Sequence, residues 1–259
     1  MANSGSAFPE SPPFLRLSRW VLAVLLALSA GTMIGAAVLA AQTVRLPFPG
    51  LFTEPTLVVN NIGSMAWSGY AAGLRLPEQL VAIDGQPLDR PTALMDALRA
   101  RQVGETVTFT ARDAETGAVR QVRVYLTPLP RLALWDFFLI PYGLGLFYLA
   151  AGGVMLGLRG REESGQVFAL FCIFIALVTG LFFDLYTTHR LFPLWVAAVP
   201  LTGSAAIHLA LVFPQPTPLL RRFPWLRLLA YLPALGLAVA GWLTTADMAH
   251  PIAYFAPWR

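Results

Sequence analysis

The stretch from Trp20 to Ala41 reads WVLAVLLALSAGTMIGAAVLAA and contains no charged residue. About 20 mostly apolar residues are enough for a helix to cross the hydrocarbon core of a bilayer. Four more apolar stretches of similar length follow, at residues 134–158, 167–186, 192–213 and 226–246. The chain is 56% hydrophobic and only 12% charged, which excludes an ordinary soluble globule. The sequence therefore predicts an α-helical membrane protein with about five spans.

The first apolar stretch has two interpretations, an uncleaved anchor or a removable signal peptide. Arg16 and Arg19 precede it, and small residues occur at Ala40 and Ala41, as signal peptides require. The apolar region of a signal peptide usually has about 7–15 residues, however, and this stretch is longer. The sequence favours a transmembrane anchor at residues 19–42, preceded by a cytoplasmic tail at residues 1–18.

Arginines near the ends of the spans predict the orientation of the chain. They occur before the first stretch, after the second, and between the fourth and fifth: Arg16, Arg19, Arg159, Arg161, Arg221, Arg222 and Arg227. Alternating spans place these three clusters on one side, which should be the cytoplasm because short cytoplasmic loops carry an excess of basic residues. The polar region at residues 43–131 is then extracytoplasmic, and residues 132–259 form a transmembrane bundle of four helices.

The polar region between the first two spans has the pattern of a small folded domain. The alternation of Val107, Phe109 and Ala111 is typical of a half-buried strand, and Asp84-Gly85 is typical of a tight turn. The expected elements are strands at residues 56–62 and 79–83, a helix at residues 91–101, and a hairpin made by residues 106–112 and 119–126. We expect an α+β domain of about ninety residues.

Residues 71–88 read AAGLRLPEQLVAIDGQPL, and this run resembles the signature of bacterial PDZ domains. The resemblance covers about a third of the chain. It departs from the family at two places. Pro77-Glu78 replaces the usual Gly-Asp pair, and residues 63–70 are longer and more aromatic than usual. The resemblance implies an extracytoplasmic PDZ-like domain between the first and second spans.

PDZ domains bind peptides as an added strand and hold the terminal carboxylate with backbone N–H groups. By this resemblance, residues 49–52 would form the carboxylate loop, and the groove would lie between the strand at residues 56–62 and the helix at residues 91–101. The expected peptide-binding residues are Gly50, Leu51, Phe52, Leu57, Val59, Leu94 and Leu98. Alternatively, Gly50 and Phe52 are a turn and a core anchor, and Trp67 and Tyr70 pack over the groove or against the membrane.

A second resemblance lies at the end of the fourth apolar stretch. His208, Leu211, Phe213 and Pro214 form a His-x-x-Leu-x-Phe-Pro pattern, similar to the sensor halves of some bacterial membrane histidine kinases. These include the competence-type kinases, which also place a PDZ-like domain after their first span. The resemblance implies a multi-pass protein of the bacterial cytoplasmic (inner) membrane in which His208, Phe213 and Pro214 take part in signal coupling. The alternative is a neutral His208 bonded to a neighbouring helix.

The chain contains no recognisable catalytic motif. Its three histidines, His189, His208 and His250, are scattered, and none belongs to a His-Glu-x-x-His pair. There is no Gly-x-Ser-x-Gly motif and no P-loop, and Cys172 is the single cysteine. We therefore expect no enzyme activity, no cofactor and no metal in this chain, although a kinase or phosphatase domain would be expected downstream if the chain is part of a longer protein.

These observations lead to two functional expectations. The first is a sensory or signal-transduction module whose outer domain binds a peptide or an envelope protein. The second is a non-enzymatic scaffold or accessory subunit of a membrane complex, which the lack of catalytic residues favours. The expected partners are a peptide or protein ligand and membrane lipids, with a homodimer as a further expectation. Nucleic acid is not expected, because the chain has no basic stripe with interleaved aromatic residues.

Overall fold

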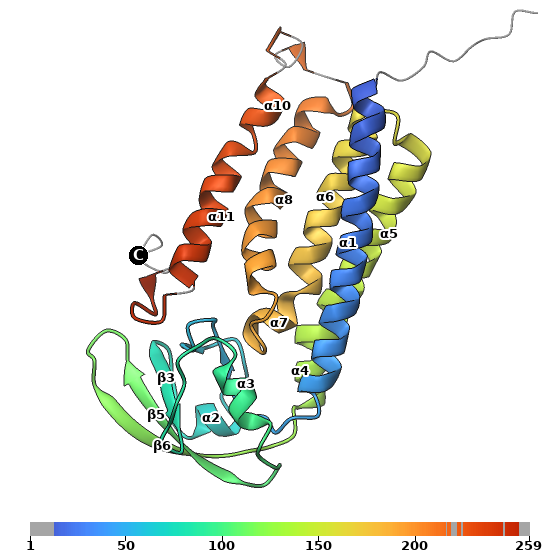
Figure 1. Cartoon of the computed structure of the whole chain (residues 1–259). Coiled ribbons are helices and arrows are strands. Elements are labelled where there is room, and N and C mark those ends of the chain that lie inside the picture. Colours follow the sequence, from blue (N-terminus) through green and yellow to red (C-terminus); the bar gives the residue numbers. More distant parts are fainter. Residues whose placement is uncertain (1–12, 216, 219–221, 224, 246, 254–259) are drawn as a thin grey trace, which may run out of the picture.

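The structure is a computed structural model that describes residues 13–215, 217–218, 222–223, 225–245 and 247–253. Within these residues, five helices are long and apolar enough to span a membrane: Ser18–Thr43, Arg131–Arg159, Glu163–Tyr186, Phe192–Val212 and Leu226–Thr245. They confirm the five apolar stretches predicted from the sequence. The helices form an elongated bundle with the sheet-containing domain at one end (Figure 1).

Several spans consist of more than one helical element. The elements are α1 (Pro13–Thr43), α4 (Arg131–Leu134) with a π-helical turn η1 (Trp135–Leu139) and α5 (Ile140–Arg159), α6 (Glu163–Gly180) with α7 (Phe182–Tyr186), α8 (Phe192–Val212), and α10 (Leu226–Leu229) with α11 (Leu232–Thr245). Helix α1 begins within the tail expected at residues 1–18, since proline is compatible with a first helical turn. The rest of that tail, residues 1–12, lies outside the described residues.

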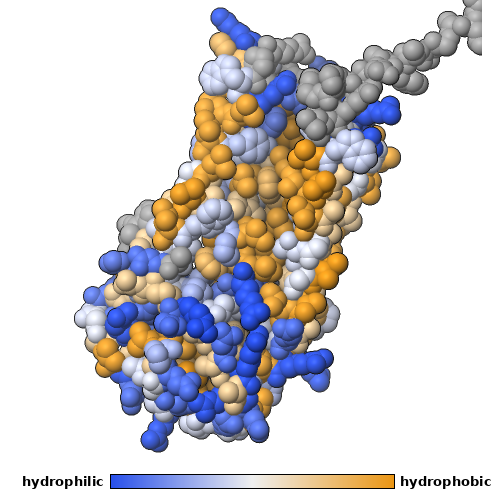
Figure 2. All heavy atoms as spheres, in the orientation of Figure 1, coloured by the Kyte–Doolittle hydropathy of each residue, from blue (hydrophilic) through white to orange (hydrophobic). Residues whose placement is uncertain are grey.

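Helix α6 is the central helix of the bundle and packs against α1, α5 and α8. Glycines on α5 allow its close approach: a Cβ at Gly145 would lie 2.9 Å from the carbonyl oxygen of Ala176, and one at Gly152 would lie 2.9 Å from the Cβ of Cys172. On the face shown in Figure 2, apolar residues cover most of the length of the bundle, whereas hydrophilic residues gather on the domain and at the opposite end. This distribution suits a bundle surrounded by lipid.

The domain between α1 and α4 contains two small antiparallel sheets. Its elements are β1 (Phe52–Thr53), β2 (Val59–Asn60), α2 (Ser68–Ala71), β3 (Glu78–Ile83), β4 (Gln86–Pro87), α3 (Ala93–Leu98), β5 (Thr106–Asp113) and β6 (Val119–Tyr125). One sheet pairs β1 with β2, and the other has the order β4-β3-β5-β6. The predicted hairpin is confirmed as β5 and β6, in which Val107 faces Val124 and Phe109 faces Val122.

The predicted tight turn is present, and the core lies on the expected face of β5. Asp84 and Gly85 have φ angles of 47° and 80° and join β3 to β4, as in the turns of two-residue hairpins. Val107, Phe109 and Ala111 are fully buried, together with leucines from α3 and β3. The alternation in the sequence therefore predicted which side of the strand faces the core.

Two predicted elements are shorter in the structure. The strand expected at residues 56–62 is reduced to β2, because the chain turns at Leu57, whose φ is 61° and whose amide bonds the carbonyl of Glu54 at 2.8 Å. The helix expected at residues 91–101 extends over α3 alone. The segment after α11, which belongs to residues 132–259, also contacts this domain through Met248 and Pro251.

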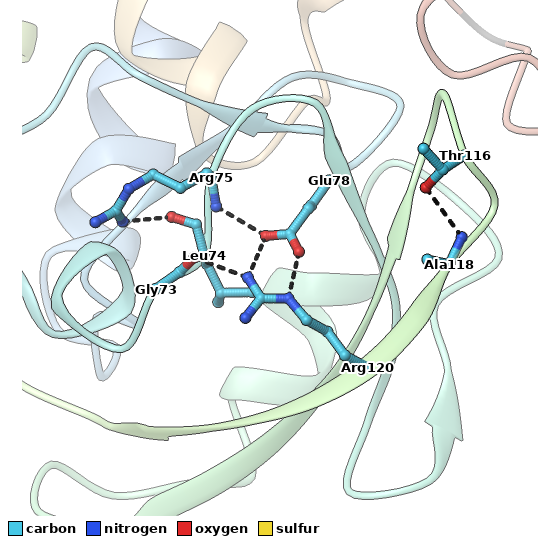
Figure 3. Close-up of polar contacts among 7 residues, drawn as sticks. All are labelled: Gly73, Leu74, Arg75, Glu78, Thr116, Ala118 and Arg120. Carbon is cyan, nitrogen blue, oxygen red and sulfur yellow. Dashed lines mark hydrogen bonds and ion pairs between the residues drawn. The ribbon is translucent and has the colours of Figure 1, made fainter.

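Glu78, at the start of β3, is the centre of a hydrogen-bond network (Figure 3). The carboxylate of Glu78 accepts hydrogen bonds from Arg120 Nε at 2.5 Å, from Arg120 Nη2 at 2.8 Å, and from the amide of Arg75 at 2.9 Å. Arg120 Nη2 also donates to the carbonyl of Gly73 at 2.8 Å. A charge-assisted network thus joins the loop before β3 to β6.

Candidate functional site

The position of β1 decides where a peptide could add a strand to this domain. Strand β2 already has neighbours on both sides: it pairs with β1, and the bridge between Val58 and Gln79 joins it to β3. An added strand needs an edge with unpaired backbone groups. In this arrangement both sides of β2 are paired, and β1 is the next strand outward from β3.

The side chains predicted to bind a peptide lie inside the molecule. Each is at most 2% exposed: Leu51, Phe52, Leu57, Val59, Leu94 and Leu98. Five of them belong to the main core of the domain, and Phe52 belongs to an aromatic cluster. Leu94 and Leu98 thus both face the core, so neither contributes an exposed groove surface in this arrangement.

Gly50 occupies a close contact between the predicted carboxylate loop and α2. Its φ is +67°, and a Cβ there would lie 2.3 Å from Ser68 Oγ and 2.5 Å from the backbone nitrogen of Gly69. Both the positive φ and the lack of space require glycine. The loop at residues 49–52 is packed against α2, which agrees with the alternative that Gly50 forms a turn.

Phe52 connects the domain to the bundle through aromatic contacts. Its ring centroid lies 5.0 Å from that of Phe137 on η1 and 6.5 Å from that of Phe183 on α7. Trp67 meets Phe52 edge-on at 5.5 Å and stacks on Tyr70 at 6.2 Å. Trp67 also lies 6.5 Å from the ring of Phe137 on η1, so it packs between the domain and the bundle.

The loop between α7 and α8, residues 187–191, contacts two elements of the domain at once. His189 Nε2 lies 3.1 Å from the Oγ1 atom of Thr53 on β1. The next residue, Arg190, places Nη2 3.9 Å from the Oδ1 atom of Asp96 on α3. We call this set of contacts, made by Thr53, Asp96, His189 and Arg190, the loop contact site. It joins β1 and α3 to the bundle.

Hydrogen bonding determines the tautomer of His189 in the loop contact site. Its Nδ1 lies 2.8 Å from the carbonyl oxygen of Leu185, which can only accept, so Nδ1 carries the proton. Nε2 then accepts from the hydroxyl of Thr53. Burial lowers the pKa of His189 to about 4, so the ring is neutral at neutral pH.

Asp184 holds the α7–α8 loop in shape from within the bundle. Its carboxylate accepts from the hydroxyl of Thr188 and, at 2.7 Å, from the amide of Leu191. Its backbone carbonyl accepts from the amide of His189 at 2.9 Å. His189 has a φ of 55°, a conformation uncommon for residues other than glycine. Local bonds thus fix a strained loop conformation that presents the imidazole to β1.

A second contact joins the domain to the segment after α11. The Oγ1 atom of Thr56 donates to the carbonyl of Pro251 at 2.9 Å, and Nε2 of Gln79 donates to the carbonyl of Met248 at 3.0 Å. Arg112 Nη2 orients Gln79 by donating to its Oε1 atom at 2.6 Å. The loop before the fourth span and the segment after the fifth span therefore both contact the domain.

Glu54, in the turn after β1, is a buried carboxyl group next to this junction. Its side chain accepts a hydrogen bond from Asn60, and the residue is 9% exposed. Burial raises the pKa of Glu54 to about 7, and the hydrogen bond from Asn60 opposes this shift. Glu54 is therefore partly protonated near neutral pH.

The other end of the bundle contains a polar cluster around His208. His208 Nδ1 lies 3.1 Å from the hydroxyl of Tyr231, and Nε2 lies 3.7 Å from Glu163 Oε1. Arg227 Nε lies 3.0 Å from the same carboxylate oxygen. These four residues, which we call the His208 cluster, link α6 and α8 to the segment preceding α11. Phe213 and Pro214, the other predicted coupling residues, are exposed.

Sequence reasoning singled out His208 but missed the loop contact site. His189 was visible in the sequence as an isolated histidine between two spans, and Thr53 and Asp96 carry no pattern of their own. Among the described residues, no three His, Cys, Asp or Glu side chains are arranged to hold a metal ion. No protein-family model matches the chain, and no curated protein matches it significantly.

Proposed function

We propose that this chain is a sensory module of a bacterial cytoplasmic membrane, with the PDZ-like domain outside and the helical bundle transmitting its state inward. The supporting observation is the path of α8. This helix begins at Phe192, two residues after Arg190 of the loop contact site, and contains His208 near its other end. Its 21 residues correspond to about 32 Å, so one helix joins the domain to the His208 cluster.

A ligand transmits a signal only if it binds two arrangements of the protein with different affinity. A peptide or envelope protein that changes the contacts of Thr53 or Asp96 would act directly on the loop that leads into α8. A shift of α8 would then change the distances of His208 from Tyr231 and Glu163, which lie on neighbouring elements. Phe213 and Pro214 follow the helix and would carry the change to a downstream output domain.

The proposed orientation rests on the arginine distribution and is testable independently of function. Single cysteines at Gln86 and at Ser164, in a Cys172→Ser background, would be exposed to a membrane-impermeant maleimide in intact cells. We expect labelling at position 86 and none at position 164. Both variants are labelled after the cells are opened, which is the control for reactivity. Labelling at 164 alone in intact cells would reverse the orientation.

Signal transmission is testable with the full chain in lipid nanodiscs. Peptide libraries with free or amidated C-termini are screened for binding, and an environment-sensitive fluorophore at Ser164→Cys, in the same Cys172→Ser background, reports on the inner end. We expect a binding peptide to change the fluorescence. His208→Phe should keep the binding and reduce the response, whereas Ser204→Ala, one turn earlier on α8, should keep both.

If a peptide binds but the fluorescence at position 164 does not change, the proposal that the bundle transmits a signal is contradicted. Failure of every peptide to bind would favour the second candidate function, a scaffold or accessory subunit in which the domain serves packing. The complete burial of the predicted peptide-binding side chains favours this candidate. Purification in mild detergent tests it, because a scaffold should retain a partner in fixed stoichiometry.

A further inference from the structure

The α7–α8 loop contacts two separate elements of the domain, β1 and α3. Two consecutive residues reach opposite sides: His189 contacts β1 at Thr53, and Arg190 faces α3 at Asp96. The loop is buried there, with His189 2%, Thr187 2% and Thr188 7% exposed. A buried segment of the bundle is therefore docked on the domain.

The loop keeps its shape through bonds that do not involve the domain. Asp184 binds the Thr188 hydroxyl and the Leu191 amide, and Leu185 binds the His189 ring. All these partners belong to residues 184–191, so the loop would remain ordered if the domain moved away. A preformed segment loses little conformational entropy on docking, which is a property of a well-built ligand.

Among the residues that the structure describes, two polar contacts cross between the loop and the domain, and both are weak by comparison. One is a neutral hydrogen bond, and the other is an ion pair at 3.9 Å whose side chains are 42% and 32% exposed. Neutral hydrogen bonds and exposed ion pairs each contribute about 1 kcal/mol or less. The polar part of the loop contact site is therefore easily exchanged for equivalent contacts from another molecule.

We infer that the α7–α8 loop is an internal ligand of the outer domain, and that the site between β1 and α3 alternates between a closed state with this loop bound and an open state. The inference rests on the proposed sensory function and specifies its trigger. An external polypeptide segment would compete with the loop by offering a hydrogen-bond acceptor to Thr53 and a cation to Asp96. Its binding would release the loop and the start of α8.

The opening can be measured without any ligand. In a Cys172→Ser background, Thr53→Cys places a thiol at a position that is 1% exposed and is covered in the closed state. The rate at which N-ethylmaleimide modifies this thiol in the nanodisc-embedded chain reports the open fraction. Val107→Cys, at a fully buried core position, reports opening of the whole domain in the same assay.

Arg190 provides the perturbation because it lies outside the core of the domain. Loss of a half-exposed ion pair in Arg190→Gln should raise the labelling rate at position 53 about two- to fivefold. Arg190→Glu, which places two carboxylates opposite each other, should raise it further. Arg123→Glu is the matched control, since it makes the same charge change on the exposed strand β6 and should leave the rate unchanged.

The labelling rate at position 107 should stay constant in all variants. Two results would overturn the inference: no acceleration at position 53 in Arg190→Glu, or equal labelling rates at positions 53 and 107, which would mean that the loop separates only when the domain unfolds. Neither result concerns peptide binding, which the library screen judges separately. Failure of the internal-ligand model and failure of the sensory function are therefore distinguishable.

Discussion

Replacement of Gly50 by alanine tests the packing of the predicted carboxylate loop against α2. Gly50 has a φ of +67°, and a Cβ would lie 2.5 Å from two backbone nitrogens, those of Ser68 and Gly69. The left-handed conformation costs an alanine about 1–2 kcal/mol. The clash adds about 1–3 kcal/mol, because backbone atoms cannot rotate away as a side chain can.

Gly117→Ala is the matched control for this substitution. Its φ of +74° is nearly the same, but nothing lies within 4 Å of the added Cβ. The two variants thus share the conformational cost, and their difference isolates the clash. Since 1 kcal/mol shifts the melting temperature of a domain of this size by about 4–8 °C, a clash of about 2 kcal/mol corresponds to roughly 10 °C.

The assay follows the temperature at which the thiol of Val107→Cys becomes reactive in the full chain, in a Cys172→Ser background. We expect Gly50→Ala to lower this temperature clearly more than Gly117→Ala does. Equal shifts would refute the reasoning, because they would show that the loop has room for a side chain. The loop at residues 49–52 would then be open enough to receive a peptide terminus.

Three further predictions concern polar side chains and their partners. The raised pKa of Glu54 means that the folded state binds the proton of this carboxyl group more tightly than the unfolded state does. The protonated carboxyl group therefore contributes stability that is complete below pH 4.5 and is lost as the pH rises through about 7. The loss is about 3 kcal/mol at most, and Glu54→Gln should abolish this pH dependence of domain melting. Arg120→Lys removes the two-atom contact with the Glu78 carboxylate and should destabilise the domain by about 1 kcal/mol. A melting temperature equal to that of the wild type would contradict this prediction. Tyr231→Phe leaves His208 Nδ1 without its partner and should destabilise the bundle by about 0.6 kcal/mol in thermal unfolding in detergent, whereas no change would show that this bond is not formed.

The sequence by itself determined the spans and the regular part of the domain. Hydropathy over about 20 residues and the alternation in β5 are local properties, and they follow directly from whether a side chain meets lipid, core or water. The turn at Asp84-Gly85 was predictable for the same reason, because glycine and aspartate tolerate the backbone angles that it requires.

The tertiary structure alone decided which of these elements meet. Thr53 and His189 are 136 residues apart, and Gln79 and Met248 are 169 residues apart. No periodicity or motif predicts such a contact, because nothing in the segment around either residue specifies a distant partner. The resemblance implied a groove beside residues 56–62, and only the structure showed that β2 lies between β1 and β3. Chain geometry and packing, summed over the whole molecule, brought the loop of the bundle to β1 and α3.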